Sequence, residues 1–280
     1  MIVVTGATGV LGGLIVEQLL ARLPASDVGV SVRDVEKAAG LTARGVRVRR
    51  GDFGAPADLA YAFEGASTVL LVSSNARAYG QDPIAQHTSV IAAARAAGVQ
   101  RIVYTSQIAC SHTSKFGPAR DHALTEDLLR DSGLKWTALR HGFYASSGLA
   151  VIAAGLKAGV ITAPRDGKVS WTAHEDLAAA AAAILLDDGC FDGPTPPLTA
   201  DVALDFAEVA ALANVQREVI ADDVFVANMS ARGAPAAAAA FALGMYEAMR
   251  DGEFAAVDPT LQRLIGRAPI KLATLLSPSK

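Results

Sequence analysis

Three glycines near the start of the chain recur at every third position. Gly6, Gly9 and Gly12 stand in the segment Thr5-Gly6-Ala7-Thr8-Gly9-Val10-Leu11-Gly12, between an apolar run at 2–4 and a helical pattern. In such a loop the first glycine permits a tight turn, the second lets backbone N–H groups approach a pyrophosphate, and the third allows close packing of helix on strand. The unpaired N–H groups and the positive dipole end of the helix then stabilise the anion. The alternative is an ordinary glycine-rich turn. The predicted dinucleotide contacts are Gly6, Thr8, Gly9, Val10, Leu11 and Gly12.

The end of the second predicted strand carries a basic residue at the position that distinguishes two dinucleotides. Arg33 follows the apolar run 28–32, about 20 residues after the glycine loop. An acidic residue there accepts hydrogen bonds from the ribose 2′-hydroxyl of NAD, whereas a guanidinium binds the 2′-phosphate of NADP in a bidentate fork. Asp34 favours NAD, although with Lys37 it also fits the start of a helix. Arg33 therefore predicts NADP(H) as the cofactor, with an exposed strand-end charge as the alternative.

Polar side chains also follow the third, fourth and fifth predicted strands. Ligands of doubly wound sheets lie at the carboxyl ends of the strands, where these residues are expected. Asp52 and Phe53, after the third strand, would border adenine or form a turn with a hydrophobic plug. The hydroxyls after the next two strands suit ribose and nicotinamide, or cap the following helix. These predicted cofactor contacts are Asp52, Phe53, Ser73, Ser74, Asn75 and Thr105.

Short β-branched runs alternate with amphipathic segments along the first half of the chain. We expect strands at 2–4, 28–32, 46–48, 68–72, 101–105 and 136–139, and helices that include 14–23 and 83–97. Such alternation predicts an α/β protein with a doubly wound parallel sheet, the Rossmann fold, in the strand order 3-2-1-4-5-6.

The strand and helix rhythm ends after residue 139. Residues 141–167 are glycine-rich and are expected to be irregular, whereas 172–186 predicts a helix that packs on the sheet. Further helices are expected at 202–213 and 235–250. We therefore predict a dinucleotide-binding core at 1–142 and a small, mostly helical substrate lobe at 143–280, with 168–199 returning to the core.

Composition excludes several classes of function. The chain has 280 residues, 51% of them hydrophobic, with 25 basic and 28 acidic side chains and no basic run, which argues against a nucleic-acid partner. Its two cysteines lack the spacing of metal ligands, so no metal is expected and a reducing cytoplasm is the predicted location. The most apolar later stretch, 177–186, is about half a membrane crossing, and no membrane partner is expected.

Several motifs together resemble the NmrA-like family of atypical short-chain dehydrogenase/reductases. Within it, the likeness is to the branch of NADPH-dependent quinone oxidoreductases and triphenylmethane-dye reductases. The resemblance covers nearly the whole chain and implies a Rossmann core, NADPH along the sheet edge, a small C-terminal substrate lobe and no metal. The motifs are the loop 5–12, Val32-Arg33-Asp34 with Lys37, Gly51-Asp52-Phe53, Thr105-Ser106, His122-Ala123-Leu124-Thr125-Glu126, Leu139-Arg140-His141-Gly142-Phe143-Tyr144 and Leu261-Gln262-Arg263-Leu264-Ile265-Gly266.

The sequence departs from its relatives at two places. His141 stands where the family pattern favours Asn, and it is expected with Phe143 on the nicotinamide side of the site, with Tyr144 toward the substrate. No tyrosine is followed four residues later by lysine, the pair that supplies the proton in ordinary short-chain dehydrogenases. His122 is the candidate replacement acid, because an unperturbed histidine has a pKa of about 6.5. The structural alternatives are an exposed or helix-start histidine for His122, and core packing for Phe143 and Tyr144.

The function predicted from the sequence is an NADPH-dependent oxidoreductase. It would transfer hydride to a quinone-like or conjugated small-molecule acceptor, whose adduct needs little acid catalysis because it is a delocalised anion or a neutral molecule. The alternative is a non-catalytic NADP(H)-binding redox sensor that acts through a protein partner, and turnover of NADPH separates the two. A nucleotide-sugar epimerase or dehydratase is disfavoured by the missing tyrosine–lysine pair. A homodimer is a further expectation.

Overall fold

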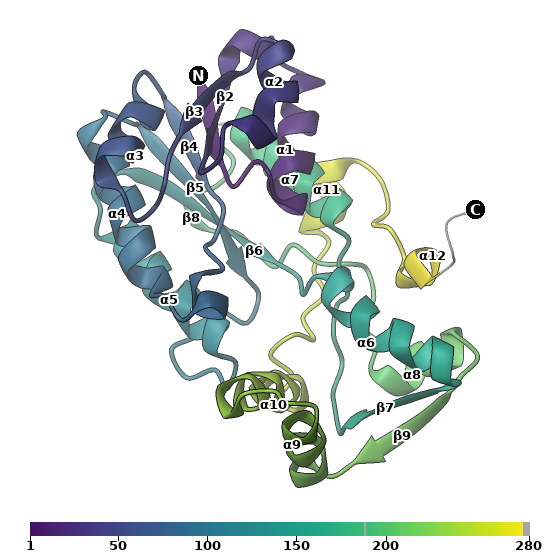
Figure 1. Cartoon of the computed structure of the whole chain (residues 1–280). Helices are drawn as coiled ribbons and strands as arrows, with labels where there is room; N and C mark the ends of the chain where they lie inside the picture. The colour runs from purple at the N-terminus through teal and green to yellow at the C-terminus, as the bar shows by residue number, and fades with distance from the viewer. Residues whose placement is uncertain (188, 277–280) are drawn as a thin grey trace. The chain divides into compact units, whose positions relative to one another are not determined.

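The predicted strands lie side by side in one sheet of the computed structural model, which describes residues 1–187 and 189–276 (Figure 1). The sheet has the order β3-β2-β1-β4-β5-β6-β8, so the predicted order is confirmed and a short seventh strand extends one edge. Strands β1 to β5 are parallel, as are β6 and β8. Their bounds are β1 Ile2–Thr5, β2 Val28–Val32, β3 Arg47–Arg50, β4 Thr68–Leu71, β5 Arg101–Gln107, β6 Lys135–His141 and β8 Gly193–Pro194.

The first strand is the point at which the order of the sheet reverses. It pairs with β2 on one side and β4 on the other, so Val4 lies between Val30 and Leu70. These three side chains are at most 1% exposed, which is typical of a sheet covered on both faces. Because the crevice at such a reversal opens at the carboxyl ends of the strands, ligands are expected where β1, β2, β4 and β5 end.

Helices cover both faces of this sheet (Figure 1). Helices α1 (Val10–Leu20) and α7 (His174–Leu186) pack against each other on one face, while α3 (Pro56–Phe63), α4 (Pro83–Ala96) and α5 (Gly117–Arg130) lie on the other. The alanines of α7 are buried against its neighbours, and their small side chains allow this close packing. The predicted Rossmann fold is therefore confirmed. Shorter helical segments are η1 Ala25–Asp27, η2 Glu36–Ala38, α2 Ala39–Ala43 and η3 Ala76–Tyr79.

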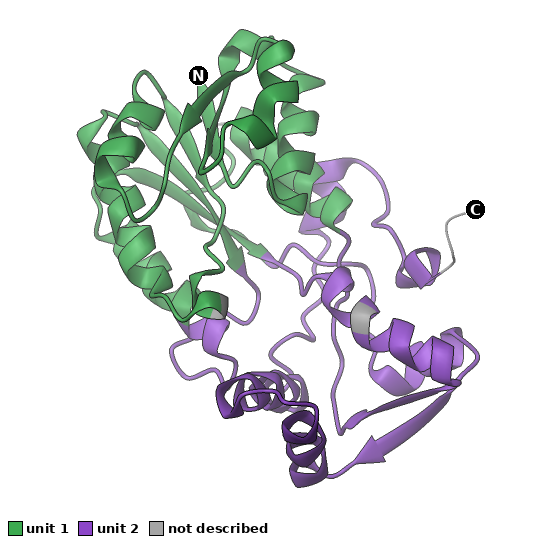
Figure 2. Ribbon diagram, in the orientation of Figure 1, with its two compact units in different colours: residues 1–106, 121–140, 174–196 green, residues 107–120, 141–173, 197–280 purple. Residues whose placement is uncertain are grey.

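The chain divides into two compact units that interleave along the sequence (Figure 2). Unit 1 comprises residues 1–106, 121–140 and 174–196 and contains the seven-stranded sheet apart from the last residues of β5 and β6. Unit 2 comprises residues 107–120, 141–173 and 197–280. The division predicted at residue 142, with 168–199 returning to the core, stays a prediction of domain organisation.

Unit 2 is mostly helical, as predicted, and has its own aromatic core. Phe143, Trp171, Phe206 and Phe254 are each at most 6% exposed and pack among one another. The parallel strands β7 and β9 form a separate two-stranded sheet. The elements are α6 Ala145–Ala158, β7 Val160–Pro164, α8 Phe206–Leu212, β9 Gln216–Ile220, α9 Asp222–Ala231, α10 Ala236–Arg250, α11 Thr260–Ile265 and α12 Leu272–Leu276.

The prediction that residues 141–167 are irregular is wrong, because the chain there forms helix α6 and strand β7. The glycines that suggested irregularity are sites of close packing. A Cβ on Gly148 would overlap the indole ring of Trp171, and one on Gly155 would overlap Ile161. A glycine inside a helix costs about 1 kcal/mol relative to alanine, and here close contact with distant residues offsets that cost.

Candidate functional site

The glycine loop joins β1 to α1 in a geometry that needs glycine for two different reasons. Gly6 has a φ of +63°, in the left-handed region that favours glycine. A Cβ on Gly12 would overlap the backbone of Gly6, so glycine is required there for the helix to pack on the turn. Gly9 is exposed, and a Cβ on it would meet only the Gly6 carbonyl oxygen, at 3.3 Å. The backbone at Gly9 is therefore open to a ligand.

The N-terminus of α1 is suited to bind an anion. Its N-cap is Gly9, no side chain caps it, and its first turn carries no acidic residue. No side chain therefore caps the backbone N–H groups at the start of the helix, which carry its positive dipole end, as a pyrophosphate site requires. Thr8 and Val10 are exposed beside these groups, whereas the Leu11 side chain is buried in the core.

Arg33 and Asp34 follow β2 with different surroundings. The Arg33 guanidinium is exposed and makes no hydrogen bond or ion pair with any residue that the structure describes. The Asp34 carboxylate accepts a hydrogen bond from the Glu36 backbone N–H (3.2 Å) and pairs with Lys37 (3.6 Å). It therefore stabilises the turn into the short helices η2 and α2. Arg33 remains available to a 2′-phosphate.

Asp52 and Phe53 follow β3 in a tight turn. The Asp52 carboxylate accepts a hydrogen bond from the Gly54 backbone N–H (2.9 Å), and Phe53 is partly buried against the hydrophobic core beneath α3 and α4. This geometry matches the alternative of a turn with a hydrophobic plug. A contact of either side chain with adenine stays a prediction.

Two buried threonines hold the chain where it leaves β4. Thr5 donates to the Leu70 carbonyl oxygen (3.1 Å) and accepts from the Val72 N–H (2.9 Å). Thr105 accepts from the Ser73 N–H (2.8 Å), so the end of β5 supports the segment after β4. Thr5 had no predicted role, since a threonine that ends a buried strand has no distinctive pattern.

Ser74 and Asn75 continue this segment. The Ser74 hydroxyl hydrogen-bonds Gln86 of α4 and accepts from the Ala76 N–H (3.1 Å), so it helps to start η3. Asn75 is exposed. The structure thus brings the glycine loop, Arg33 and the segment 73–75 to one edge of the sheet, at the ends of β1, β2 and β4.

His122 lies in α5, with its ring partly buried. Its Nδ1 is 2.6 Å from the hydroxyl of Tyr104, a fully buried residue of β5. Burial lowers the pKa of His122 to about 4, and the nearby carboxylates of Glu126 and Asp121 oppose this shift only in part. The ring is therefore neutral at pH 7, and it offers an N–H donor rather than an imidazolium. Its role as an acid stays a prediction.

A partly buried ion pair lies near the carboxyl ends of β5 and β6. Glu126 is 5% exposed and accepts two hydrogen bonds from the Arg140 guanidinium, at 2.7 and 3.2 Å. The Ser106 hydroxyl donates to the same carboxylate (2.6 Å). Ser106, Glu126 and Arg140, which belong to three of the family motifs, therefore form one cluster that ties α5 to β5 and β6.

His141, Phe143 and Tyr144 belong to unit 2. His141 is 1% exposed, and its ring centroid lies 6.2 Å from that of Tyr144. Phe143 is enclosed in the aromatic core, 4.7 Å between ring centroids from Phe254, which matches the core alternative. Burial raises the pKa of Tyr144 to about 12, so its hydroxyl stays protonated. Contacts of these three residues with cofactor or substrate stay predictions.

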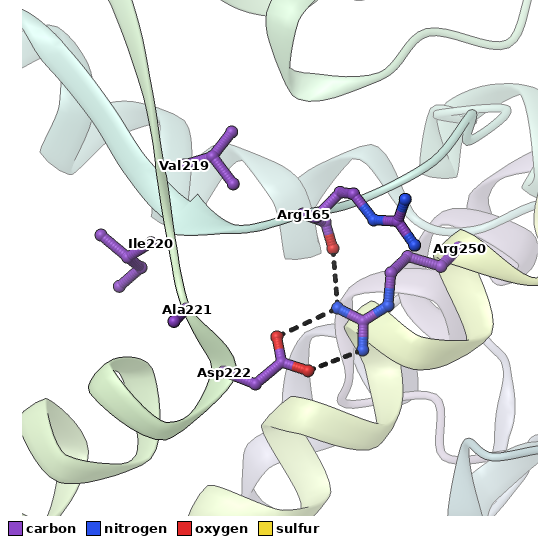
Figure 3. A pocket seen from close by; sticks show the side chains of 6 residues that line it. All are labelled: Arg165, Val219, Ile220, Ala221, Asp222 and Arg250. Atoms are coloured by element: carbon purple, nitrogen blue, oxygen red, sulfur yellow. Dashed lines mark hydrogen bonds and ion pairs between the residues drawn. The ribbon is translucent and has the colours of Figure 1, made fainter.

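A hollow on unit 2 contains none of the predicted residues (Figure 3). Arg250 crosses it, forms two bonds to the Asp222 carboxylate at 2.9 and 3.1 Å, and donates to the Arg165 carbonyl oxygen at 2.9 Å. The hydrogen bonds of Arg250 thus join α9, α10 and the end of β7.

Across residues 1–187 and 189–276 no cluster of three metal-ligating side chains occurs, and no helix there has the length and apolar character of a membrane span.

Comparison with known proteins agrees with this geometry. A family described as NAD(P)H-binding matches residues 6–188. Quinone oxidoreductase 2 of Escherichia coli is 37% identical over 99% of this chain and 98% of its own length. An NmrA-like family domain-containing oxidoreductase of Aspergillus flavus is 30% identical over 95% of this chain and 91% of its own.

Solved structures extend the likeness to the fold. An NADPH-dependent quinone oxidoreductase from Escherichia coli, complexed with NADPH, has a TM-score of 0.90 at 35% identity, over 99% of this chain and 98% of that one. The triphenylmethane reductase of a Citrobacter species, complexed with NADP(H), has a TM-score of 0.87 at 32% identity, over 99% of both chains. The predicted resemblance is confirmed, and the chain belongs to the NAD(P)H-binding, NmrA-like family of oxidoreductases.

Proposed function

We propose that this chain transfers hydride from NADPH to a quinone-like or otherwise conjugated acceptor. The observation that carries the choice of cofactor is the unpaired Arg33 guanidinium at the same sheet edge as the uncapped N-terminus of α1. The choice of acceptor is supported by the names of the relatives, a quinone oxidoreductase and a triphenylmethane reductase. A small molecule is thus the second substrate.

Each part of the site has a separate task. The start of α1 would bind the pyrophosphate, and Arg33 would bind the 2′-phosphate through charge-assisted bonds. Asp52 and Phe53 would border the adenine. The segment 73–75 and Thr105 would orient the ribose and nicotinamide, with His141 and Phe143 as further candidates and Tyr144 toward the acceptor. NADPH supplies the hydride, which adds to the acceptor and leaves NADP⁺.

The proton balance explains why a dedicated acid is dispensable. A quinone that receives hydride becomes a hydroquinone monoanion, which then takes one proton from a donor or from water. A cationic triarylmethane dye that receives hydride becomes neutral and takes no proton. We assign His122 as the candidate donor to the quinone product: its ring would take a proton from water and pass it to the hydroquinone oxygen, because the N–H of a neutral imidazole is itself too weak an acid.

The test is to measure NADPH consumption with a panel of benzoquinones, naphthoquinones and cationic triarylmethane dyes. We expect turnover with at least one acceptor and a clear preference for NADPH over NADH. Tight binding of NADPH without turnover on any acceptor would favour a redox sensor, a function that the oxidoreductase relatives do not support.

We further propose a homodimer in the cytoplasm, where NADPH is available. Light scattering tests the oligomeric state, and cell fractionation tests the location.

A further inference from the structure

A buried histidine supports the segment that follows β4. His87 lies in α4 and is 1% exposed. Its Nε2 is 2.9 Å from the backbone nitrogen of Ser74, and its Nδ1 is 2.8 Å from the Thr125 hydroxyl of α5. The ring therefore joins two helices to one peptide of the proposed cofactor edge.

The direction of these hydrogen bonds follows from their partners. The backbone N–H of Ser74 only donates, so Nε2 must accept and carries no proton. Burial lowers the pKa of His87 to about 3, with the nearby His122 adding to the shift and Asp82 opposing it, so the ring is neutral at pH 7. Nδ1 then holds the proton and donates to Thr125, whose own hydroxyl donates to the Asp121 carbonyl oxygen (2.8 Å). Each donor and each acceptor in this series of hydrogen bonds therefore has a partner.

The supported segment lies on one side of the point where the strand order reverses. In a doubly wound sheet the residue after β2 contacts the adenosine ribose, so the other half of the dinucleotide lies toward β4 and β5. Thr105 holds the Ser73 N–H and His87 holds the Ser74 N–H. Two consecutive backbone N–H groups, on the side of the site where the nicotinamide is expected, are thus held by buried side chains.

We propose that His87 is a positioning residue for the nicotinamide half of NADPH, acting through the Ser74 peptide. This inference rests on the proposed function, because it assumes that a dinucleotide spans this sheet edge. His87 itself is not a catalytic residue: its ring is enclosed between α4, α5 and Tyr104, whose ring centroid is 5.5 Å away. Loss of its acceptor nitrogen would leave the Ser74 N–H unpaired and free the segment to move.

The decisive experiment compares two ligands on the same variants. NADPH needs both halves of the site, whereas adenosine 2′,5′-bisphosphate needs only the adenosine half, at Arg33 and the start of α1. His87→Phe keeps a ring against Tyr104 but has no acceptor. We expect its dissociation constant for NADPH, and its KM, to rise about 5- to 100-fold, the range for one unpaired buried donor, with binding of the bisphosphate changed less than about twofold.

Two further variants keep the test decisive if His87→Phe folds poorly. His87→Gln places an amide oxygen near the position of Nε2 and should restore NADPH affinity to within about threefold of the unmodified protein. Thr125→Val removes the acceptor of the Nδ1 proton and should weaken NADPH binding while sparing the bisphosphate. The control is Thr88→Ala, the next residue of α4, whose exposed hydroxyl bonds only within its own helix.

The outcomes separate this inference from the proposed function. Equal weakening of both ligands, or none in any His87 variant, would overturn the positioning role. Failure of the unmodified protein to oxidise NADPH with any acceptor would overturn the proposed function instead. In that case the two-ligand comparison still decides whether His87 supports the nicotinamide half of the bound cofactor.

Discussion

Arg33 and Asp34 are neighbours of opposite charge, and only the Asp34 side chain is engaged in the turn that follows β2. The carboxylate of Asp34 is committed to the Glu36 N–H and to Lys37, whereas the guanidinium of Arg33 is exposed beyond β2. A carboxylate that already accepts a hydrogen bond in the turn before η2 has less capacity to accept from a ribose 2′-hydroxyl. We therefore expect the choice between NAD and NADP to depend on local hydrogen bonds as well as on residue type.

Arg33→Ala should remove the preference for NADPH over NADH. A hydrogen bond to a charged group contributes about 1.5–3 kcal/mol, so NADPH affinity should fall roughly 10- to 100-fold while NADH affinity changes little. Fluorescence titration with both dinucleotides measures this. Lys37→Ala is the matched control, because it removes a nearby exposed positive charge that pairs with Asp34. Equal affinity for the two dinucleotides in the unmodified protein would contradict the assignment.

His122→Ala should separate acid catalysis from shaping of the site. If the ring donates a proton, kcat with a quinone should fall by about 10²-fold, since general acid catalysis typically contributes that much or more. With a cationic triarylmethane dye kcat should change little, because no oxyanion develops. Equal losses with both acceptors would mean that His122 shapes the site, and no loss with either would show that it has no part in the reaction.

At the scale of the element, the strand–turn–helix unit of β1 and α1 uses its glycines for separate purposes. Gly12 lets the helix approach the turn, so it serves folding. Gly9 has ordinary extended backbone angles (φ −88°, ψ 169°) and an open face, so folding does not require glycine there and we expect it to serve the ligand. Substitutions at the two positions should therefore fail in different ways.

Gly9→Val should abolish NADPH binding and leave the protein folded, because the side chain would fill the space that the pyrophosphate needs. Gly12→Ala should instead lower the free energy of unfolding by about 1–3 kcal/mol, through overlap with the backbone of Gly6. Titration and thermal unfolding followed by circular dichroism distinguish the two. Gly40→Ala, where a Cβ meets nothing within 4 Å, is the control. Retained NADPH affinity in Gly9→Val would mean that the loop is only structural.

At the scale of the whole molecule, two histidines make stability depend on pH. His87 and His122 have pKa values of about 3 and about 4 in the folded chain, against about 6.5 when unfolded, and burial is the largest cause for both. Between pH 6.5 and 4 the unfolded chain therefore binds more protons than the folded one. The stability associated with the neutral rings is present above pH 6.5 and is lost as the pH falls.

The free energy of unfolding should accordingly decrease as the pH is lowered from 7 to 5. His87 contributes up to about 1.4 kcal/mol per pH unit in this window, and His122 less because its ring is partly exposed. Urea unfolding at several pH values measures the slope. His87→Gln should be less sensitive to acid than the unmodified protein, and an unchanged slope in that variant would show that folding does not lower the pKa of His87.

Local sequence patterns were sufficient to predict the main sheet and the loop that begins the proposed cofactor site. Short β-branched runs and amphipathic segments predicted the six main strands and their order, because strand and helix periodicities are local properties. The glycine loop and Arg33 were likewise predicted, since each depends on its distance from a strand end. Thr5 and the position of α6 escaped prediction, because neither has a local signal.

Tertiary structure decided what depends on distant neighbours. Gly148 and Gly155 suggested an irregular segment, yet they lie in a helix because Trp171 and Ile161 occupy the space beside them. Phe143 follows a strand at the expected position, and only packing against residues such as Phe254 shows that it is enclosed. The function of His87 required two partners 13 and 38 residues away. Sequence patterns report which elements form, whereas the space around a side chain is set by long-range packing that no local pattern encodes.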